Sequence, residues 1–191
     1  MKEKFFHKEY IDLTNLIQDE FQRNVELHGE KINCRKGCSQ CCHQIFNITL
    51  ADAYIIKEYL NSLPSEKKLE LKERAKAYIE KFDPGDKAAE FFNKPKQACP
   101  ALNESGECMI YYGRPVICRR FGPPVYDYKN PGKLFACVLN FKDGEEIIDS
   151  LLIPNQTQIG KKWDELKTEF NIKEGHDKNS GTTIAAAILN S

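Results

Sequence analysis

Eight cysteines constrain this chain more than any other feature of its sequence. Four of them lie within nine residues, and the other four are spread over 99–137. The chain begins Met1-Lys2-Glu3-Lys4 and shows no export signal. Because a reducing compartment does not maintain disulfides, cysteines there usually bind metal or carry out redox chemistry. We therefore predict a cytoplasmic protein whose metal ligands are Cys34, Cys38, Cys41, Cys42, Cys99, Cys108, Cys118 and Cys137.

The length and charge of the chain exclude several classes of protein. A chain of 191 residues is long enough for one ordinary core, so we predict a single metal-binding domain over 1–191. Lys+Arg and Asp+Glu are equal at 28 each, so no overall charge attracts nucleic acid. No apolar run approaches the roughly 18 residues that a membrane span needs. The expected partner is a metal ion, with no nucleic acid and no membrane.

Helical periodicity appears on both sides of the first cysteine group. Apolar residues recur at helical spacing over 3–28, which predicts an N-terminal helix. After the cysteines of 34–42, Thr49 and Asp52 form a capping-box variant that opens a second helix. The periodicity restarts at Pro64-Ser65, so we expect a helical excursion over 50–93.

The second cysteine group lies in a region without a helical pattern of apolar residues. Glycines and prolines replace helical periodicity, so we expect loops there and a short two-stranded β-ribbon, with 134–141 as the best strand. Helices are predicted again over 145–189, at 145–153, 156–170 and 182–189. The predicted fold class is mostly α: an irregular cysteine-rich metal-binding centre with a short β-ribbon, surrounded by helices.

The first cysteine group has the spacing of a metal-binding knuckle. In a helix its four sulfurs would fall within about 100° of arc, and a turn at Gly37 would also gather three of them. Cys41 and Cys42 are adjacent, which is difficult for one tetrahedral ion. The pair therefore indicates two sites or a cluster with more than one metal.

The cysteines of the second group are farther apart in sequence, so the fold must bring them together. Turn-forming residues between Cys99 and Cys108 should fold the chain back on itself, while Cys118 and Cys137 must be brought in from farther away. Four cysteines in each group is the count that two four-thiolate sites require, and zinc and iron–sulfur centres both accept four thiolates. We expect the two groups to lie together in space.

Cations accompany both groups. A metal with four thiolates is negatively charged, so nearby cations can compensate that charge. These cations are Arg35 and Lys36 in the first group, and Arg114, Arg119 and Arg120 around Cys118. The same cations could instead bind an anionic ligand or substrate. His43 follows Cys42 directly and is either a ligand or a hydrogen-bond partner.

Two other uses could explain an even number of cysteines. A disulfide framework suits the even count, but such frameworks are typical of small exported chains. Cysteines that serve only as small core residues are not expected next to charged residues. Charged residues lie close to Cys34, Cys38 and Cys118, which argues against this use. Metal ligation explains the pattern better than either.

The cysteine region also resembles a known family. Its pattern is Cys34-x3-Cys38-x2-Cys41-Cys42, then Cys99-Pro100-x-Leu102, then Cys108-x-Ile110-Tyr111-x2-Arg114-Pro115-x2-Cys118-Arg119-x-Phe121. Over roughly 34–137 this is similar to the CxxCxxCC family of putative zinc- or iron-chelating domains. The resemblance implies a bacterial or related cytoplasmic protein in which all eight cysteines are ligand candidates, with Cys137 beyond the last motif residue.

The sequence supports two hypotheses about function. In the first, the chain chelates zinc or iron, including iron in an iron–sulfur cluster, through up to eight thiolates. In the second, the metal centre serves an enzyme, and the resemblance implies a relation to flagellin lysine N-methylation. Because a structural site is closed by four protein ligands and a catalytic one keeps a position open, coordination distinguishes the two.

Overall fold

A computed structural model describes residues 3–81 and 97–191 of the chain. It is mostly helical, as the sequence predicts, with only short antiparallel strands among the described residues. The residues form two compact units. The first unit is Met1–Cys38 with Val116–Ser180, and the second is Ser39–Pro115 with Gly181–Ser191. The single domain over 1–191 stays a prediction.

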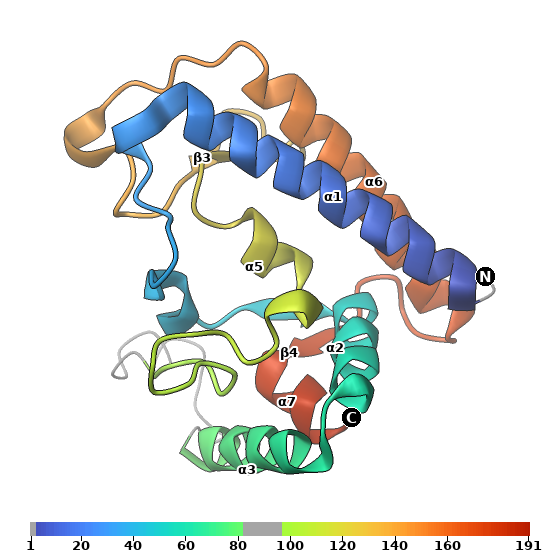
Figure 1. The fold of residues 1–191 in the computed structure, drawn as a ribbon. Helices are drawn as coiled ribbons and strands as arrows, with labels where there is room; N and C mark the ends of the chain where they lie inside the picture. Colours follow the sequence, from blue (N-terminus) through green and yellow to red (C-terminus); the bar gives the residue numbers. More distant parts are fainter. Residues whose placement is uncertain (1–2, 82–96) are drawn as a thin grey trace. The chain divides into compact units, whose positions relative to one another are not determined.

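Two long helices form the frame of the first unit. Figure 1 shows α1 (Glu3–His28) and α6 (Leu152–Lys173) side by side and running in opposite directions. Aromatic rings join them: the Phe6 and Phe170 centroids are 4.7 Å apart, and Tyr10 meets Trp163 edge-on at 6.0 Å. The predicted N-terminal helix is thus confirmed, and its apolar face is buried against α6.

Shorter elements complete the first unit. The helix α5 (Val116–Arg120) packs on α1, and β2 (Val125–Tyr126) pairs antiparallel with β3 (Leu134–Phe135) and contacts α6. Two 3₁₀ turns, η1 (Gly29–Lys31) and η4 (Lys142–Gly144), follow α1 and the ribbon region. The predicted β-ribbon is confirmed, although each strand has only two residues.

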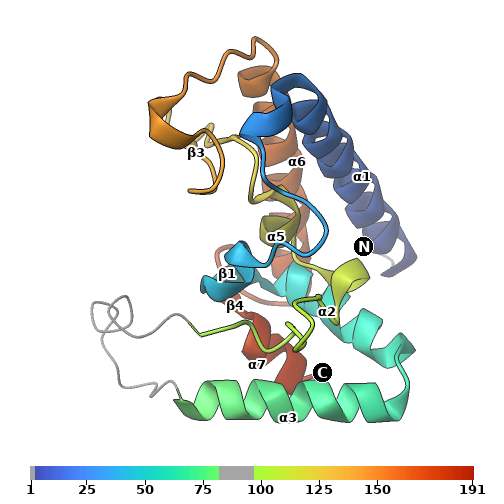
Figure 2. The same ribbon diagram turned by 60° about the vertical axis from the view of Figure 1, so that its left-hand side comes forward.

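The second unit is built around a short helix near its end. Figure 2 shows α7 (Ile184–Leu189) between α2 (Leu50–Ser62) and α3 (Ser65–Lys81), and α7 contacts both. The strand β4 (Gly181–Thr183) leads into α7 and pairs antiparallel with β1 (Asn47–Thr49). The remaining elements are the 3₁₀ turns η2 (Gln40–His43) and η3 (Tyr111–Gly113).

The predicted capping box is confirmed at the start of α2. The Thr49 hydroxyl accepts a hydrogen bond from the Asp52 amide, and the Asp52 carboxylate accepts one from the Thr49 amide. These reciprocal bonds satisfy N–H groups that the first turn of a helix leaves without partners. The predicted excursion is helical over α2 and α3, and its part from 82 to 93 lies outside the described residues.

Three sequence predictions were wrong. Residues 145–151 are not helical, because the Asp149 carboxylate accepts from Arg23 on α1 and from the Leu151 amide, which fixes a turn before α6. The first two residues of the predicted 182–189 helix belong to β4. The cysteine-bearing region also contains the helix α5, where only loops and a ribbon were expected.

A buried polar network fixes the end of α1 to the turn before α6. Arg23 donates to the carboxylates of Glu20 and Asp149, and Glu20 also accepts from Asn24 and Asn155. Burial raises the pKa of the Glu20 carboxyl, but its hydrogen bonds outweigh that effect and leave the pKa lowered. The network therefore holds Glu20 ionised inside the first unit.

No helix in the described part of the chain is both long and apolar enough to cross a membrane.

Candidate metal centre

The two units divide the cysteines differently from the sequence. Each unit contains two members of the first group and two of the second. We call Cys34, Cys38, Cys118 and Cys137, which lie in the first unit, the first quartet. Cys41, Cys42, Cys99 and Cys108 lie in the second unit and form the second quartet. All eight are free thiols, which leaves them available as ligands.

Asn140 organises the region of the first quartet. It is 4% exposed, and its side chain contacts two separate segments of the chain. Its Nδ2 donates to the Gly122 carbonyl at 2.6 Å and to Cys34 Sγ at 3.4 Å, while its Oδ1 accepts from the Asn33 amide at 2.8 Å. An N–H group directed at a cysteine sulfur stabilises the thiolate form, which is the form that binds metal.

Gly122 lies directly against Cys34. Its φ is +135°, in a region that essentially only glycine adopts, and a Cβ at this position would lie 2.6 Å from Cys34 Sγ. The Gly122 carbonyl also accepts from the Cys137 amide at 3.0 Å. The absence of a side chain at Gly122 therefore lets its backbone, which also binds the Cys137 amide, approach the Cys34 sulfur.

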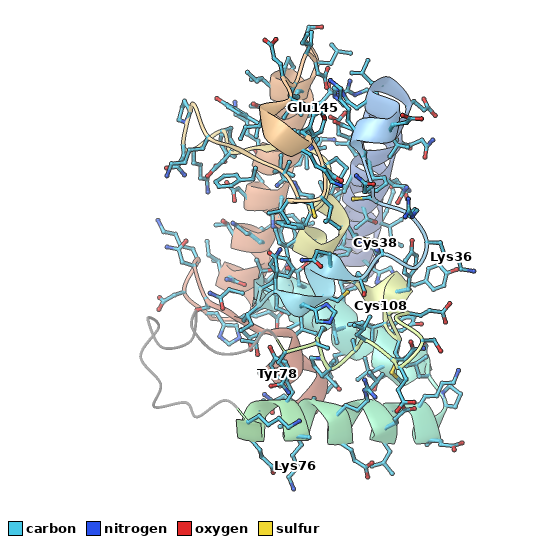
Figure 3. All side chains as sticks on the ribbon, turned by 90° about the vertical axis from the view of Figure 1, so that its left-hand side faces the viewer. Lys36, Cys38, Lys76, Tyr78, Cys108 and Glu145 are labelled. Carbon is cyan, nitrogen blue, oxygen red and sulfur yellow. The ribbon has the colours of Figure 1, made fainter. Side chains whose placement is uncertain are left out.

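The other members of the first quartet differ in exposure. Cys137 is buried, at 5% exposed, and its carbonyl accepts from the Asn140 amide at 2.8 Å. Cys118 is half-buried on α5, whose last residue precedes Gly122 by only two positions. Cys38 is exposed, on the loop after α1. Figure 3 shows Cys38 and Lys36 on this loop.

Arg120 is a half-buried cation of the first unit. Its Nη2 donates to Gln156 Oε1 at 2.9 Å, while its Nε is buried without a hydrogen-bond partner among the described residues. Burial lowers the pKa of the Arg120 guanidinium, against the opposing charges of Asp127 and Asp164. Its guanidinium lies on the helix that carries Cys118 and adds positive charge to this unit.

The second quartet is held together first by the backbone. Cys41 and Cys42 lie in η2, and the Cys42 carbonyl accepts a hydrogen bond of 2.7 Å from the Cys99 amide. This bond joins residues of the two sequence groups. The hydrogen bond between the Cys41 and Cys42 side chains, followed by burial, raises the pKa of the Cys41 thiol.

The segment from Cys99 to Met109 folds back as its turn residues predicted. Leu102 pairs with Cys108 in an antiparallel bridge, and the Met109 amide donates to the Ala101 carbonyl at 2.8 Å. Asn103 closes the turn, because its side chain accepts from the Glu107 amide at 2.7 Å. Folding back brings Cys108 alongside the turn that begins at Cys99.

Two thiols of the second quartet have raised pKa values. Burial, with the charges of Cys108 and Cys41, raises the pKa of Cys99 to about 11, against the lowering effects of the Ala101 backbone and Arg74. Burial and the nearby Cys99 also raise the pKa of Tyr78 to about 12. The raised pKa values of Cys41 and Cys99 favour the protonated form of these two thiols at neutral pH, so a metal ion that binds them would displace their protons.

A helix side chain holds the Cys99 turn in place. Arg74 on α3 donates through Nε to the Pro100 carbonyl at 2.9 Å and through Nη2 to the Leu102 carbonyl. Figure 3 shows Tyr78 on the face of α3 toward this turn, whereas Lys76 points away from it. Arg74 therefore fixes the carbonyls that follow a candidate ligand.

Two residues singled out in the sequence have other contacts. His43 Nδ1 lies 3.1 Å from the Ser39 carbonyl oxygen, which is the hydrogen-bond role considered for it. Arg114 stacks on the Tyr111 ring at 3.7 Å and donates to the Tyr111 carbonyl at 3.0 Å. Its charge also lowers the pKa of Cys41, against the larger raising effects. Arg114 thus lies near the second quartet.

The side-chain positions do not form a closed coordination shell. Over 3–81 and 97–191, no three His, Cys, Asp or Glu side chains are placed to hold one metal ion. The donor chemistry nevertheless fits zinc or iron, since each unit contains four free cysteines and the Cys34 sulfur accepts an N–H donor. Ligation would require the sulfurs of a unit to move toward one another.

Sequence reasoning missed the residues that support the cysteines. Asn140 and Arg74 carry no motif signal, because an asparagine in a loop and an arginine on a helix are usually exposed. Gly122 could have been noticed, since Gly122-Pro123-Pro124 follows Cys118 closely and a glycine before two prolines indicates a special backbone.

Comparison with known proteins identifies the cysteine region. No curated protein and no solved structure matches the chain. A family model does match, over residues 33–132, and this range contains seven of the eight cysteines. Cys137 lies beyond the match, as expected from its distance to the last motif residue. The chain therefore belongs to the CxxCxxCC family, described as a "putative zinc- or iron-chelating domain".

Proposed function

We propose that this chain is a cytoplasmic metal-binding protein that holds zinc or iron, including iron in an iron–sulfur cluster, through its eight cysteines. The first quartet serves one site and the second quartet another, each within its own unit. The observation that carries the proposal is the backbone bond from Cys99 to Cys42, which joins the two sequence groups inside the second unit. The antiparallel bridge between Leu102 and Cys108, and the charges of Cys41 and Cys108 that raise the pKa of Cys99, support the same set.

The first unit supports an equivalent site by different means. Asn140 ties the Cys34 sulfur and the Gly122 carbonyl together, and Gly122 in turn accepts from the Cys137 amide. Cys34, Cys38, Cys118 and Cys137 would be the ligands of this site. The metal would contribute to stability, because metal binding free energy becomes folding free energy when the unfolded chain has no preformed site.

The test begins with anaerobic purification, metal analysis and a visible spectrum. We expect two zinc or iron centres per chain. Colourless zinc would favour a structural or binding role. Iron with acid-labile sulfide would favour the alternative, a metal-centre enzyme related to lysine N-methylation, and would call for an assay with a protein lysine substrate. A metal-free protein that gains no metal under reducing conditions would refute the proposal.

Paired substitutions test how the cysteines are divided. Cys38→Ser and Cys41→Ser change residues only three positions apart, yet the proposal assigns them to different sites. Their combination should lose both metals. Cys38→Ser combined with Cys118→Ser should lose only one, although these residues are far apart in sequence. If the first pair loses one metal and the second pair loses two, the division by unit is wrong.

A further inference from the structure

A pocket of about 340 Å³ lies in the first unit, beside the loop that carries Cys38. Arg35, Lys36 and Lys142 line it, together with Gly37 and the thiol of Cys38. Among the described residues, none of those lining it is acidic. The described wall of this pocket therefore carries three positive charges and no negative one.

These cations have no role in holding the described fold. None of Arg35, Lys36 and Lys142 forms an ion pair or a side-chain hydrogen bond with a described residue, and all three are exposed. By contrast, Arg23 and Lys129 in the same unit bind carboxylates. Like charges gathered without counter-charges repel one another, so an anion that bound among them would stabilise the arrangement.

The backbone of the loop leaves room for such an anion. The Cys38 amide donates to the Arg35 carbonyl at 3.0 Å, which closes a turn with Gly37 at φ +89°. A Cβ at Gly37 would have no atom within 4 Å, so the turn borders open space. The amides of Lys36 and Gly37 donate to no described residue, and amides in a turn of this kind add N–H donors for an anion.

The geometry points to a binding site for a small oxyanion that carries at least two negative charges, either a phosphate group or a dicarboxylate. The volume is at the small end of ligand pockets, which fits one compact ligand rather than a macromolecular surface. Arg35 can bind two oxygens at once through its planar guanidinium, and the two lysines add point charges. The site goes beyond the proposed metal binding, because it requires no metal–anion bond.

The test uses the full, metal-loaded chain and amide NMR. Inorganic phosphate, sulfate and succinate are added in turn, with acetate as the monovalent control at equal ionic strength. We expect saturable shifts of the Lys36 and Gly37 amides with the divalent probes and not with acetate. A stronger response to phosphate than to succinate identifies a phosphate-bearing ligand, and the reverse identifies a dicarboxylate. Absence of saturation with all three divalent probes overturns the inference.

Charge-matched variants separate a built site from general attraction. Lys36→Gln combined with Lys142→Gln should weaken binding of the best probe at least tenfold. Lys161→Gln combined with Lys162→Gln removes the same charge from exposed positions on α6 and should change binding less than twofold. Equal losses in the two pairs would mean non-specific attraction and would overturn the site.

Metal analysis of the same variants separates this inference from the proposed function. The Lys36→Gln, Lys142→Gln protein should keep its metal, because its lysines face the anion. If it loses metal together with the anion, the cations compensate the thiolates and the anion site is wrong. A chain that binds no metal but still binds phosphate or succinate would refute the proposed function alone. Arg35→Gln, a single change, repeats the test if the double variant folds poorly.

Discussion

Replacing Gly122 by alanine should destabilise the first unit in two separable ways. The new Cβ would lie 2.6 Å from Cys34 Sγ, and neither atom belongs to a long flexible side chain that can move aside. Inserting an atom into a well-packed site costs about 1–3 kcal/mol. The φ of +135° adds about 1–3 kcal/mol of backbone strain for a residue other than glycine.

A second glycine isolates the effect of the contact. Gly132 also has a positive φ, +90°, in the first unit, but a Cβ there would have nothing within 4 Å. Gly132→Ala should therefore show backbone strain alone, about 1–3 kcal/mol. Gly122→Ala should exceed it by the cost of the clash and lower the melting temperature by roughly 4–24 °C, at about 2–4 °C per kcal/mol.

The single tryptophan provides the assay. Trp163 is 8% exposed on α6, so its fluorescence reports unfolding of the first unit. Urea titration followed at this signal gives the free energy of unfolding for both variants, and metal analysis shows whether displacing the Cys34 sulfur removes one metal. If Gly122→Ala is no more destabilising than Gly132→Ala and keeps all its metal, the close approach of Gly122 to Cys34 has no structural role.

Three further predictions concern a ligand, a helix contact and an ion pair. Cys118→Ser should lower metal content and melting temperature together, since a structural metal can contribute about 10 kcal/mol or more. Arg119→Gln should leave the metal bound. The reverse result in metal analysis would mean that Arg119, and not Cys118, is needed to hold the metal. Arg74→Ala should destabilise the second unit by about 1–3 kcal/mol in thermal unfolding, because the Pro100 and Leu102 carbonyls lose a charged donor. The control Lys76→Ala, on the other face of α3, should cost under about 0.5 kcal/mol. Burial raises the pKa of Asp164, but hydrogen bonds from Lys129, Lys167 and Tyr128 lower it to about 2. The stability that the Asp164 carboxylate contributes is therefore present above the unfolded pKa of about 3.9 and is lost as pH falls toward 2. The urea midpoint of Asp164→Asn should accordingly vary less between pH 4 and pH 2 than that of the unchanged protein, and an equal pH dependence would contradict the ion pair.

Local signals in the sequence predicted the helices well. The apolar spacing over 3–28 and the Thr49–Asp52 capping box depend only on neighbouring residues, and both elements formed as expected. The 145–153 helix failed for a non-local reason, since Arg23 on α1 engages the Asp149 carboxylate and stabilises a turn instead. Likewise, 181–183 became a strand because Asn47–Thr49 offers a partner far away in the sequence.

The cysteines could be predicted as candidate ligands, but their division between the units could not. Spacing alone groups Cys38 with Cys41, which lie three residues apart. The structure separates them at Cys38–Ser39, where the chain passes from the first unit to the second. Contacts such as the bond from Asn140 to Cys34 join residues 106 positions apart, and no local pattern predicts them.

The path of the chain through its two units has a consequence for synthesis on the ribosome. Domains usually fold in order as the N-terminal part emerges. Here the first unit needs residues up to Ser180, and the second needs β4 and α7 from Gly181–Ser191. Neither unit can complete its folding when only its N-terminal segment has left the ribosome. All eight thiols therefore leave the ribosome before either unit is complete. Nascent chains should therefore depend on thiol protection until nearly the whole sequence is available.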